Sequence, residues 1–399
     1  MPKLQPQTSS PPRVVHMTSA HEWWDGRIFQ KECRSLANAG YEVIELTNEE
    51  TDTHQDGVRI RGLGACRSRL HRVTSKMIVM ACQGFRSRAD VYHFHDPDLL
   101  PVGLLLRAFN KCVIYDIHED VPRTVLHKHY VPARLRVPLM WLTELVENSA
   151  ARAMSGLVAA TPAIAHRFCR INSNTVVVNN FPILSELALT NRKAWSARSM
   201  SVAYIGGIAE GRGIREVLSA ISQVPETGAK LELAGWYSNP ALETELIHSS
   251  AWRYVEWHGL LCRAGIAELL GSVRAGLVPF HPEPNCVTAL PTKLFEYMSA
   301  GIPVIASDFP LWRSIVEGAG CGLLVDPCEP ASIAKAISYL LTHDTEAEAM
   351  GKRGRAAVER QYNWGAEERS LLNFYSALTH SKCDKARLSN QYIDSESDV

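Results

Sequence analysis

Short runs of β-branched and other apolar residues alternate with helix-length amphipathic segments along most of the chain. The first six runs are VVHM (14–17), YEVIEL (41–46), DVYHF (90–94), CVIYDI (112–117), GLVAA (156–160) and TVVVNN (175–180). Strands that alternate with helices build a parallel sheet whose two faces are covered by those helices. The first half of the chain is therefore expected to form a doubly wound α/β domain.

A second series of runs begins after a polar stretch at 190–200. Its members are SVAYIGG (201–207), KLELAG (230–235), RYVEWHG (253–259), AGLVPF (275–280), IPVIAS (302–307) and CGLLV (321–325). Two such series in 399 residues predict two Rossmann-like domains that face each other across a ligand-binding cleft. The expected ranges are a disordered N-terminus (1–12), an N-terminal domain (13–182), a linker (183–200), a C-terminal domain with terminal helices (201–379) and a polar tail (380–399).

Composition excludes several classes of protein. Lys and Arg number 42, as do Asp and Glu, so the chain has no net charge and no nucleic-acid partner is expected. The 10 cysteines form no C-x-x-C pair, which disfavours a zinc ribbon and fits reduced thiols in the cytoplasm. No apolar run reaches the roughly 18 residues of a membrane-spanning helix.

The segment PTKLFEYMSAGIPVIASDFP at 291–310 combines a short helical pattern with a following apolar strand. Lys293 and Glu296 lie on neighbouring turns of the expected helix. The two oxygens of a glutamate carboxylate match the vicinal hydroxyls of a ribose, and a lysine there can face phosphate. The alternative is a solvated Lys–Glu pair with no ligand.

A glycine turn follows the first strand of the second series, in YIGGIAEGRGI at 204–214. Backbone amides after Gly206 and Gly207, together with Arg212, are suited to neutralise a diphosphate. The pattern G-G-x-x-x-G-R-G is not the G-x-G-x-x-G fingerprint of dinucleotide-binding domains. A nicotinamide-dependent dehydrogenase is therefore disfavoured.

Two N-terminal strings, VYHFHDPDLLPVG (91–103) and VIYDIHEDVP (113–122), place histidines and acids at strand ends, where doubly wound folds bind ligands. The residues concerned are His95, Asp96, His118 and Glu119. A histidine is suited to donate or accept a hydrogen bond near neutral pH, although a satisfied structural histidine is the alternative. A metal site built from His93, His95, Asp96 and His118 is disfavoured because adjacent strand residues alternate faces, so no metal is expected.

The stretch RTVLHKHYVPARLRVPLMW at 123–141 mixes basic, aromatic and apolar residues. Such a mixture is typical of an interfacial helix that touches anionic lipid head groups. A plain amphipathic surface helix is the other interpretation. Peripheral membrane contact is therefore one expected partnership.

The segment at 291–310 resembles the donor-binding signature of glycosyltransferase family 4, which has the GT-B fold. The resemblance extends through 204–214, LAGWY (233–237) with Gly235, WHGLL (257–261) and CGLLVDPCEP (321–330), and through both N-terminal strings. It implies that His118 lies beside the anomeric carbon and diphosphate. It also implies that the D-x-R element Asp25-Gly26-Arg27 faces the cleft, beside Trp23 and Trp24.

The chain departs from the family pattern at two places. Family members usually present an Arg and a Lys after the glycine turn, whereas only Arg212 stands here, and Lys293 is the candidate for the second charge. They also carry two glutamates separated by seven residues, but Thr288 occupies the first position and Glu296 the second. Glu283 and Asn285 in the same loop are the candidates to contact the transferred sugar instead.

The resemblance implies a retaining hexosyltransferase (EC 2.4) of glycan or polysaccharide biosynthesis. The expected location is the cytoplasm, with the inner face of the membrane as the alternative. The donor is a nucleotide-diphosphate sugar, with UDP-sugars favoured, and the acceptor is a hydroxyl of a saccharide, a lipid-linked saccharide or a small molecule. The nucleotide-sugar is a co-substrate, and no cofactor is expected. Two alternatives stay open: a sugar-nucleotide epimerase of the same fold and a non-catalytic nucleotide-sugar-binding relative.

Overall fold

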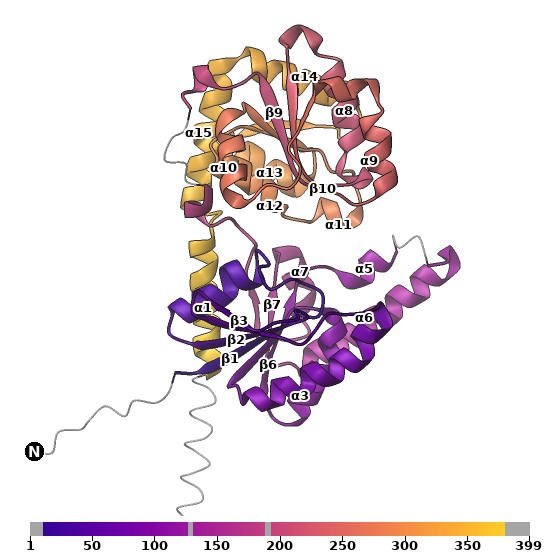
Figure 1. Ribbon diagram of the computed structural model, residues 1–399, viewed down its shortest axis with the longest axis vertical. Helices are drawn as coiled ribbons and strands as arrows, with labels where there is room; N and C mark the ends of the chain where they lie inside the picture. The colour runs from indigo at the N-terminus through magenta and orange to yellow at the C-terminus, as the bar shows by residue number, and fades with distance from the viewer. Residues whose placement is uncertain (1–10, 127–130, 188–192, 380–399) are drawn as a thin grey trace, which may run out of the picture. The chain divides into compact units, whose positions relative to one another are not determined.

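The computed structural model describes residues 11–126, 131–187 and 193–379, so the predicted tail and most of the predicted disordered N-terminus lie outside the described residues. The chain divides into two compact units (Figure 1). Unit 1 comprises Met1–Asn179 together with Glu367–Val399, and unit 2 comprises Asn180–Ala366. Among the described residues, no helix combines the length and the apolar character needed to cross a bilayer.

Unit 1 is built on an eight-stranded sheet with the order β3-β4-β2-β1-β5-β6-β7-β8. Its strands are β1 (Arg13–Met17), β2 (Glu42–Thr47), β3 (Thr53–Gln55), β4 (Val58–Gly62), β5 (Val91–Phe94), β6 (Cys112–Ile117), β7 (Gly156–Ala159) and β8 (Thr175–Val177). All neighbouring strands are parallel except the edge pair of β3 and β4, which the sequence pattern did not predict. Buried strand residues such as Val15, Tyr92 and Tyr115 form the core with the covering helices.

Helical segments of unit 1 connect the strands. They are the π-helical turn Ile28–Cys33, α1 (Arg34–Asn38), α2 (Arg69–His71), a second π-helical turn Arg72–Lys76, α3 (Met77–Ser87), a 3-10 turn Pro97–Leu99, α4 (Leu100–Ala108), α5 (Val121–Val125), α6 (Ala133–Ala153) and α7 (Pro162–Phe168). Pro97 and Pro162 each open a helical turn, where the missing N–H costs no hydrogen bond.

Unit 2 contains a six-stranded, wholly parallel sheet with the order β11-β10-β9-β12-β13-β14. Its strands are β9 (Ser201–Ile208), β10 (Lys230–Tyr237), β11 (Val255–Trp257), β12 (Ala275–Val278), β13 (Val304–Ser307) and β14 (Gly322–Val325). Its α-helices are α8 (Ile214–Ser222), α9 (Pro240–Ile247), α10 (Arg263–Ser272), α11 (Pro284–Val287), α12 (Thr292–Ser299), α13 (Pro310–Ala319), α14 (Pro330–Thr342) and α15 (Asp344–Arg360). Short 3-10 turns lie at Leu184–Leu187, Trp195–Ala197, Glu210–Arg212, Pro225–Thr227 and Ser250–Tyr254. The predicted fold class, two doubly wound parallel-sheet domains, is confirmed.

The end of the chain differs from the predicted ranges. The terminal helices expected within 201–379 include α15 and a last helix at 364–379. From Glu367 onward this last helix belongs to unit 1, because its Leu371 and Tyr375 are fully buried there and Glu367 accepts a hydrogen bond from the amide of Asn179 at 2.8 Å. The described part of the predicted linker 183–200 belongs to unit 2, where Leu187 and Trp195 are buried.

Candidate active site

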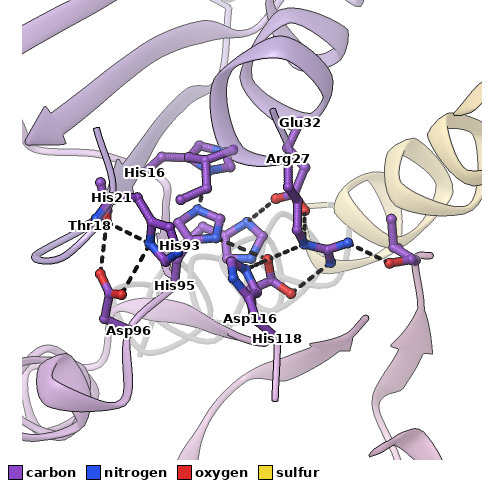
Figure 2. A network of polar contacts seen from close by, with 12 residues as sticks. His16, Thr18, His21, Arg27, Glu32, His93, His95, Asp96, Asp116 and His118 are labelled. Carbon is purple, nitrogen blue, oxygen red and sulfur yellow. Dashed lines mark hydrogen bonds and ion pairs between the residues drawn. The ribbon is translucent and has the colours of Figure 1, made fainter. Parts of the chain in front are cut away.

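The carboxyl ends of β1, β5 and β6 lie side by side in unit 1. Parallel pairing places His16 opposite His93, and β5 and β6 are paired in the same direction. His95 and Asp96 follow β5, and His118 follows β6, so these predicted residues meet at one edge of the sheet. Figure 2 shows the resulting network of side chains.

Asp116 lies at the centre of this network and is completely buried. Its Oδ2 atom lies 2.7 Å from His118 Nε2, 3.0 Å from His95 Nδ1 and 2.9 Å from Arg27 Nε, and its Oδ1 atom accepts from Arg27 Nη2 at 2.8 Å. Burial alone would raise the pKa of Asp116, but Arg27 and His118 outweigh it and hold this pKa well below its ordinary value. Asp116 is therefore an ionised acceptor, and both histidines donate to it.

The hydrogen bond that His95 donates to Asp116 also determines which nitrogen atoms of the neighbouring histidines carry a proton. Because His95 donates through Nδ1, its Nε2 accepts from His16 Nδ1 at 2.8 Å. His16 Nε2 lies 3.3 Å from the hydroxyl of Tyr375, which in turn lies 2.7 Å from His93 Nδ1. Burial lowers the pKa of His16 and of His93, so this chain is built from neutral rings. For His118, the nitrogen directed away from Asp116 is Nδ1.

The guanidinium of Arg27 is only 4% exposed and lies in the interior of unit 1. Besides Asp116, it contacts the carbonyl oxygen of Val178 at 2.7 Å and Glu32 Oε1 at 3.1 Å. Asp25 accepts the amides of Arg27 and Ile28 at 2.7 and 2.9 Å, which fixes the start of the helical turn. Gly26 is exposed between them. Trp24 is 50% exposed, and Trp23 packs edge-on against Phe29.

Asp96 turns toward the loop after β1 and not toward Asp116. Its Oδ2 accepts from Thr18 Oγ1 at 2.8 Å and from the amide of Ser19 at 2.6 Å, while Oδ1 lies 3.2 Å from His21 Nδ1. The hydrogen bond that His21 donates to Asp96 raises the pKa of His21. A cavity of 260 Å³ opens beside these groups, lined by His21, His95, Asp96, Pro97, Tyr115, His118, Glu119 and Val121. Its walls can offer both donors and acceptors to a polyhydroxylated molecule.

Among the residues that the structure describes, two groups of side chains have possible ligand atoms within 4.8 Å of one another: His16, Glu32, His93 and His95, and His95, Asp116 and His118. The 2.8 Å between His16 and His95 is a hydrogen-bond length. It is shorter than the roughly 3.3 Å that separates two nitrogens bound to one tetrahedral zinc ion. The described geometry is therefore that of a hydrogen-bonded network, and the expectation of no metal stays a prediction.

The glycines of unit 2 allow β9 and β10 to approach closely at their carboxyl ends. Gly206 and Gly235 are paired and have φ angles of +102° and +149°, which side chains rarely adopt. A Cβ on Gly235 would collide with the carbonyl oxygen of Gly206, and one on Gly207 would collide with the guanidinium of Arg212. Arg212 Nη1 contacts the Gly207 carbonyl oxygen at 3.3 Å. The glycine turn therefore holds the arginine against the strand end.

Lys293 is the second residue of α12, and its side chain is buried (6% exposed) in unit 2. Its Nζ lies 4.0 Å from the ring centre of Tyr204 and 5.4 Å from that of Phe280, with no hydrogen-bond partner among the described residues. Burial, reinforced by the charge of Arg212, lowers the pKa of Lys293 well below its ordinary value. A buried ammonium without an acceptor, beside a second cation, is stabilised by a bound anion.

Glu296 is not paired with Lys293, so the solvated Lys–Glu pair considered from the sequence is not formed. Instead its Oε1 lies 2.7 Å from Arg263 Nη1, and Arg263 also binds Glu186 at 3.0 Å. Glu296 remains on the same helix one turn from Lys293, where the sequence placed it.

The loop before α12 carries the other predicted sugar contacts. Glu283 immediately precedes α11, and its exposed carboxylate lies beside Gly211. Asn285 lies within α11. Thr288, at the position of the expected first glutamate, donates within its own segment to the Pro284 carbonyl oxygen at 3.4 Å.

Sequence reasoning missed several members of the unit 1 network, among them His16, Glu32, Asp116 and Tyr375. Asp116 had a usable signal, because it lies two residues before His118 on a strand and so points to the same side. His16 likewise stands near the end of the first predicted strand. Nothing in the sequence near Tyr375 connects it with His93, which lies 282 residues away.

Family models match both halves of the chain. Residues 26–180 match a model described as Glycosyl transferase 4-like domain, and residues 199–343 match one described as Glycosyl transferases group 1. The chain belongs to the group 1 glycosyltransferases. The family predicted from the sequence is thereby confirmed.

Curated relatives resemble this glycosyltransferase over limited segments. It is 33% identical over 88 residues to a phosphatidyl-myo-inositol mannosyltransferase of Mycobacterium leprae, which covers 22% of this chain and 23% of the relative. It is 27% identical over 198 residues to a D-inositol 3-phosphate glycosyltransferase of Corynebacterium efficiens, covering 46% and 44%. The matched segments therefore span less than half of the length of these relatives.

Solved structures resemble the glycosyltransferase over nearly its whole length. Sucrose-phosphate synthase from Thermosynechococcus elongatus has a TM-score of 0.74 at 20% identity and covers 93% of this chain and 100% of its own. Anabaena Alr3699/HepE in complex with UDP and glucose has a TM-score of 0.69 at 13% identity, covering 92% and 100%. At these identities the likeness establishes the GT-B fold.

Proposed function

We propose that the protein transfers a hexose from a nucleotide-diphosphate donor, a UDP-sugar, to a hydroxyl acceptor with retention of the anomeric configuration. Lys293 is the observation that carries this proposal. A buried, unpaired ammonium next to Arg212 is suited to a diphosphate, which supplies the missing acceptors and the opposite charge. UDP in the Anabaena structure and the two relatives named as sugar transferases agree with such a donor.

Unit 2 would hold the donor. Lys293, Arg212 and the amides after Gly206 and Gly207 would bind the diphosphate and stabilise the negative charge that it gains when the glycosidic bond breaks. Glu296 would accept the ribose hydroxyls, and Glu283 or Asn285 would contact the sugar. These assignments need no metal, because the two cations can neutralise the leaving group.

Unit 1 would hold the acceptor in the cavity beside His118. With Nε2 of His118 directed to Asp116, Nδ1 is the atom available to a sugar hydroxyl. Asp116 would keep the ring in one orientation through this hydrogen bond. The absence of a carboxylate assigned as nucleophile favours departure and attack on the same face, with retention, over a covalent intermediate. The biosynthesis of a glycan or polysaccharide is the process in which we place this reaction.

The donor site is tested by thermal unfolding with UDP, GDP and dTDP, since a ligand that binds only the folded state raises stability. Lys293→Met should raise the melting temperature of the free protein, because a buried polar group without a hydrogen-bond partner is removed, and should abolish the shift caused by the nucleotide. Lys335→Met, at an exposed lysine of α14, is the matched control and should change neither value. If Lys293→Met responds to nucleotide as the wild type does, the diphosphate site is elsewhere.

Measurements of turnover distinguish a glycosyltransferase from the two alternatives, an epimerase and a non-catalytic relative. A transferase releases UDP from a UDP-sugar faster when a hydroxyl acceptor is added, whereas an epimerase changes the sugar without any acceptor. Nucleotide binding without either reaction would leave only the non-catalytic relative. His118→Ala should lower kcat for transfer while the thermal shift with UDP persists, since His118 and Lys293 lie in different units.

A further inference from the structure

Helix α6 of unit 1 exposes large apolar side chains over its first four turns. Leu135, Val137, Leu139, Trp141, Leu142, Leu145 and Val146, called here the α6 apolar face, are each between 38% and 64% exposed. A surface helix normally turns such residues toward the core and its polar residues toward water. Contiguous apolar surface of this kind marks a site of interaction.

The opposite side of α6 is polar and is anchored to unit 1. Glu147 is buried and accepts hydrogen bonds from Tyr115 Oη at 3.0 Å and from Arg167 Nη2 at 2.8 Å. Thr143 and Glu144, on the same side, are partly buried. Because Glu147 fixes the rotation of the helix, the apolar face is held outward by defined contacts.

The width of the α6 apolar face indicates whether a partner helix or a lipid layer covers it. At 3.6 residues per turn, its side chains spread over roughly 200° around the helix axis. A single partner helix, as in a coiled coil, covers a narrower seam. A lipid layer into which the helix sinks lengthwise can cover the whole arc.

The charges around this face match an anionic surface. Between Val121 and Thr143 the sequence contains Arg123, Lys128, Arg134 and Arg136, and neither Asp nor Glu. Arg134 is exposed at the start of α6. Basic residues next to leucines and a tryptophan are the combination that holds an amphipathic helix at the level of anionic head groups.

We infer that the α6 apolar face docks on an anionic lipid surface, with Trp141 and the leucines at the acyl boundary and Arg134 among the head groups. Helix α5 packs against α6 and begins two residues after Glu119, so the docking segment follows directly from the loop of His118. If the proposed function holds, docking favours a lipid-linked acceptor. The docking itself does not depend on the proposed function.

The test is co-sedimentation of the full-length protein with vesicles of phosphatidylcholine alone or mixed with phosphatidylglycerol. The wild type should bind the mixed vesicles about tenfold more tightly than the neutral ones, and added salt should remove this difference. Leu145→Glu, at a side chain that is 64% exposed, should weaken binding to the mixed vesicles about tenfold or more. Leu260→Glu, at a 75% exposed leucine of unit 2, is the matched control and should bind as the wild type does.

A second pair of variants tests the charges. Arg134→Glu should weaken binding to mixed vesicles and leave binding to neutral ones unchanged, whereas Arg170→Glu, at an exposed arginine outside α6, should alter neither. Circular dichroism and thermal unfolding should show that all four variants are folded, since these side chains are exposed. Three results would overturn the proposal: equal binding by Leu145→Glu and wild type, equal binding to both vesicle types, or no binding to either. In the last case, a concentration-dependent dimer that Leu145→Glu dissociates would identify a second copy as the occupant.

Discussion

Asp116 and Tyr375 show how single side chains organise unit 1. Asp116 accepts from Arg27, His95 and His118, while the hydroxyl of Tyr375 closes the other end of the histidine chain at His16 and His93. Such a network is stable when each member has a partner, and the loss of one member leaves buried groups unsatisfied. The substitutions that matter here therefore remove one partner and keep the shape.

Tyr375→Phe should reduce the free energy of unfolding by about 1–3 kcal/mol, because ring nitrogens of His16 and His93 lose their partner within a buried site. Chemical denaturation followed by circular dichroism measures the change. Tyr339→Phe, at a 38% exposed tyrosine, is the control and should cost close to nothing. Equal losses in the two variants would mean that the Tyr375 hydroxyl contributes no buried hydrogen bond.

His93 should make the protein less stable as the pH falls. Burial, followed by the nearby His95 and His16, lowers the pKa of His93 well below the value of 6.5 that it has in an unfolded chain. Between these two pKa values the unfolded chain binds a proton that the folded protein does not, so stability is present above pH 6.5 and is lost as the pH falls toward the folded pKa.

The contribution of His93 can be isolated by comparing variants. His93→Gln should make the decline in unfolding free energy below about pH 6.5 shallower by about 1.4 kcal/mol per pH unit. Glu32 faces His93 at 3.7 Å, and burial raises the pKa of Glu32, which opposes the histidine effect in wild type and variant alike. His166→Gln, at an exposed histidine, should keep the slope of the wild type. An unchanged slope in His93→Gln would mean that His93 titrates normally in the folded protein.

At the level of elements, glycines set how closely helices and strands approach. Gly351 lies in the middle of α15, where a Cβ would collide with the carbonyl oxygen of Gly301 at the end of the α12 segment. Gly318 of α13 has open space around it and an ordinary backbone conformation. Replacement of glycine by alanine should therefore change the stability of unit 2 in opposite directions at Gly351 and Gly318.

Gly351→Ala should destabilise unit 2 by about 1–3 kcal/mol, because the packed backbones must separate. Gly318→Ala should stabilise it by up to about 1 kcal/mol, through the higher helix propensity of alanine. Thermal and chemical unfolding of the two variants beside the wild type give both numbers. Stabilisation by Gly351→Ala would show that α15 has room to move away from residue 301.

At the level of the whole molecule, unit 1 is assembled from two segments that are far apart in the sequence. The helix at 364–379 contributes Leu371, Phe374, Tyr375 and Leu378 to its interior. A chain that ends after Ala366 lacks these residues, although unit 2 retains all of its own. Unit 1 cannot complete its core until the last helix has been synthesised.

Ending the chain after Ala366 should lower the melting temperature of unit 1 or abolish its transition, and should leave that of unit 2 in place. Differential scanning calorimetry with limited proteolysis distinguishes the two units. A chain that ends after Thr379 is the matched control and should melt like the full-length protein. If both truncated chains melt alike, the last helix is dispensable for unit 1.

The sequence alone predicted the strands correctly where a continuous run of apolar residues marks them. The run at 201–207 became β9 (Ser201–Ile208), and the run at 112–117 became β6 with the same limits, because buried parallel strands consist of continuous apolar residues. The edge strand β3 was missed because Thr53–Gln55 consists of three exposed residues without an apolar pattern. The family signature at 291–310 was also a local signal, and it gave the family correctly.

Contacts between distant residues were decided only by the tertiary structure. The contact between Arg27 and Asp116, which lies 89 residues further along the chain, was not predicted from the sequence, and it holds the guanidinium in the interior of unit 1. The sequence predicted Lys293 and Glu296 on neighbouring turns of one helix. In the fold, Glu296 pairs with Arg263, whereas Lys293 packs among aromatic rings and has no hydrogen-bond acceptor among the described residues. Apolar periodicity determines which segments become strands and helices, because it acts within a few residues. Which charges meet depends on strand order and on how far each group is removed from water, and those properties exist only in the folded chain.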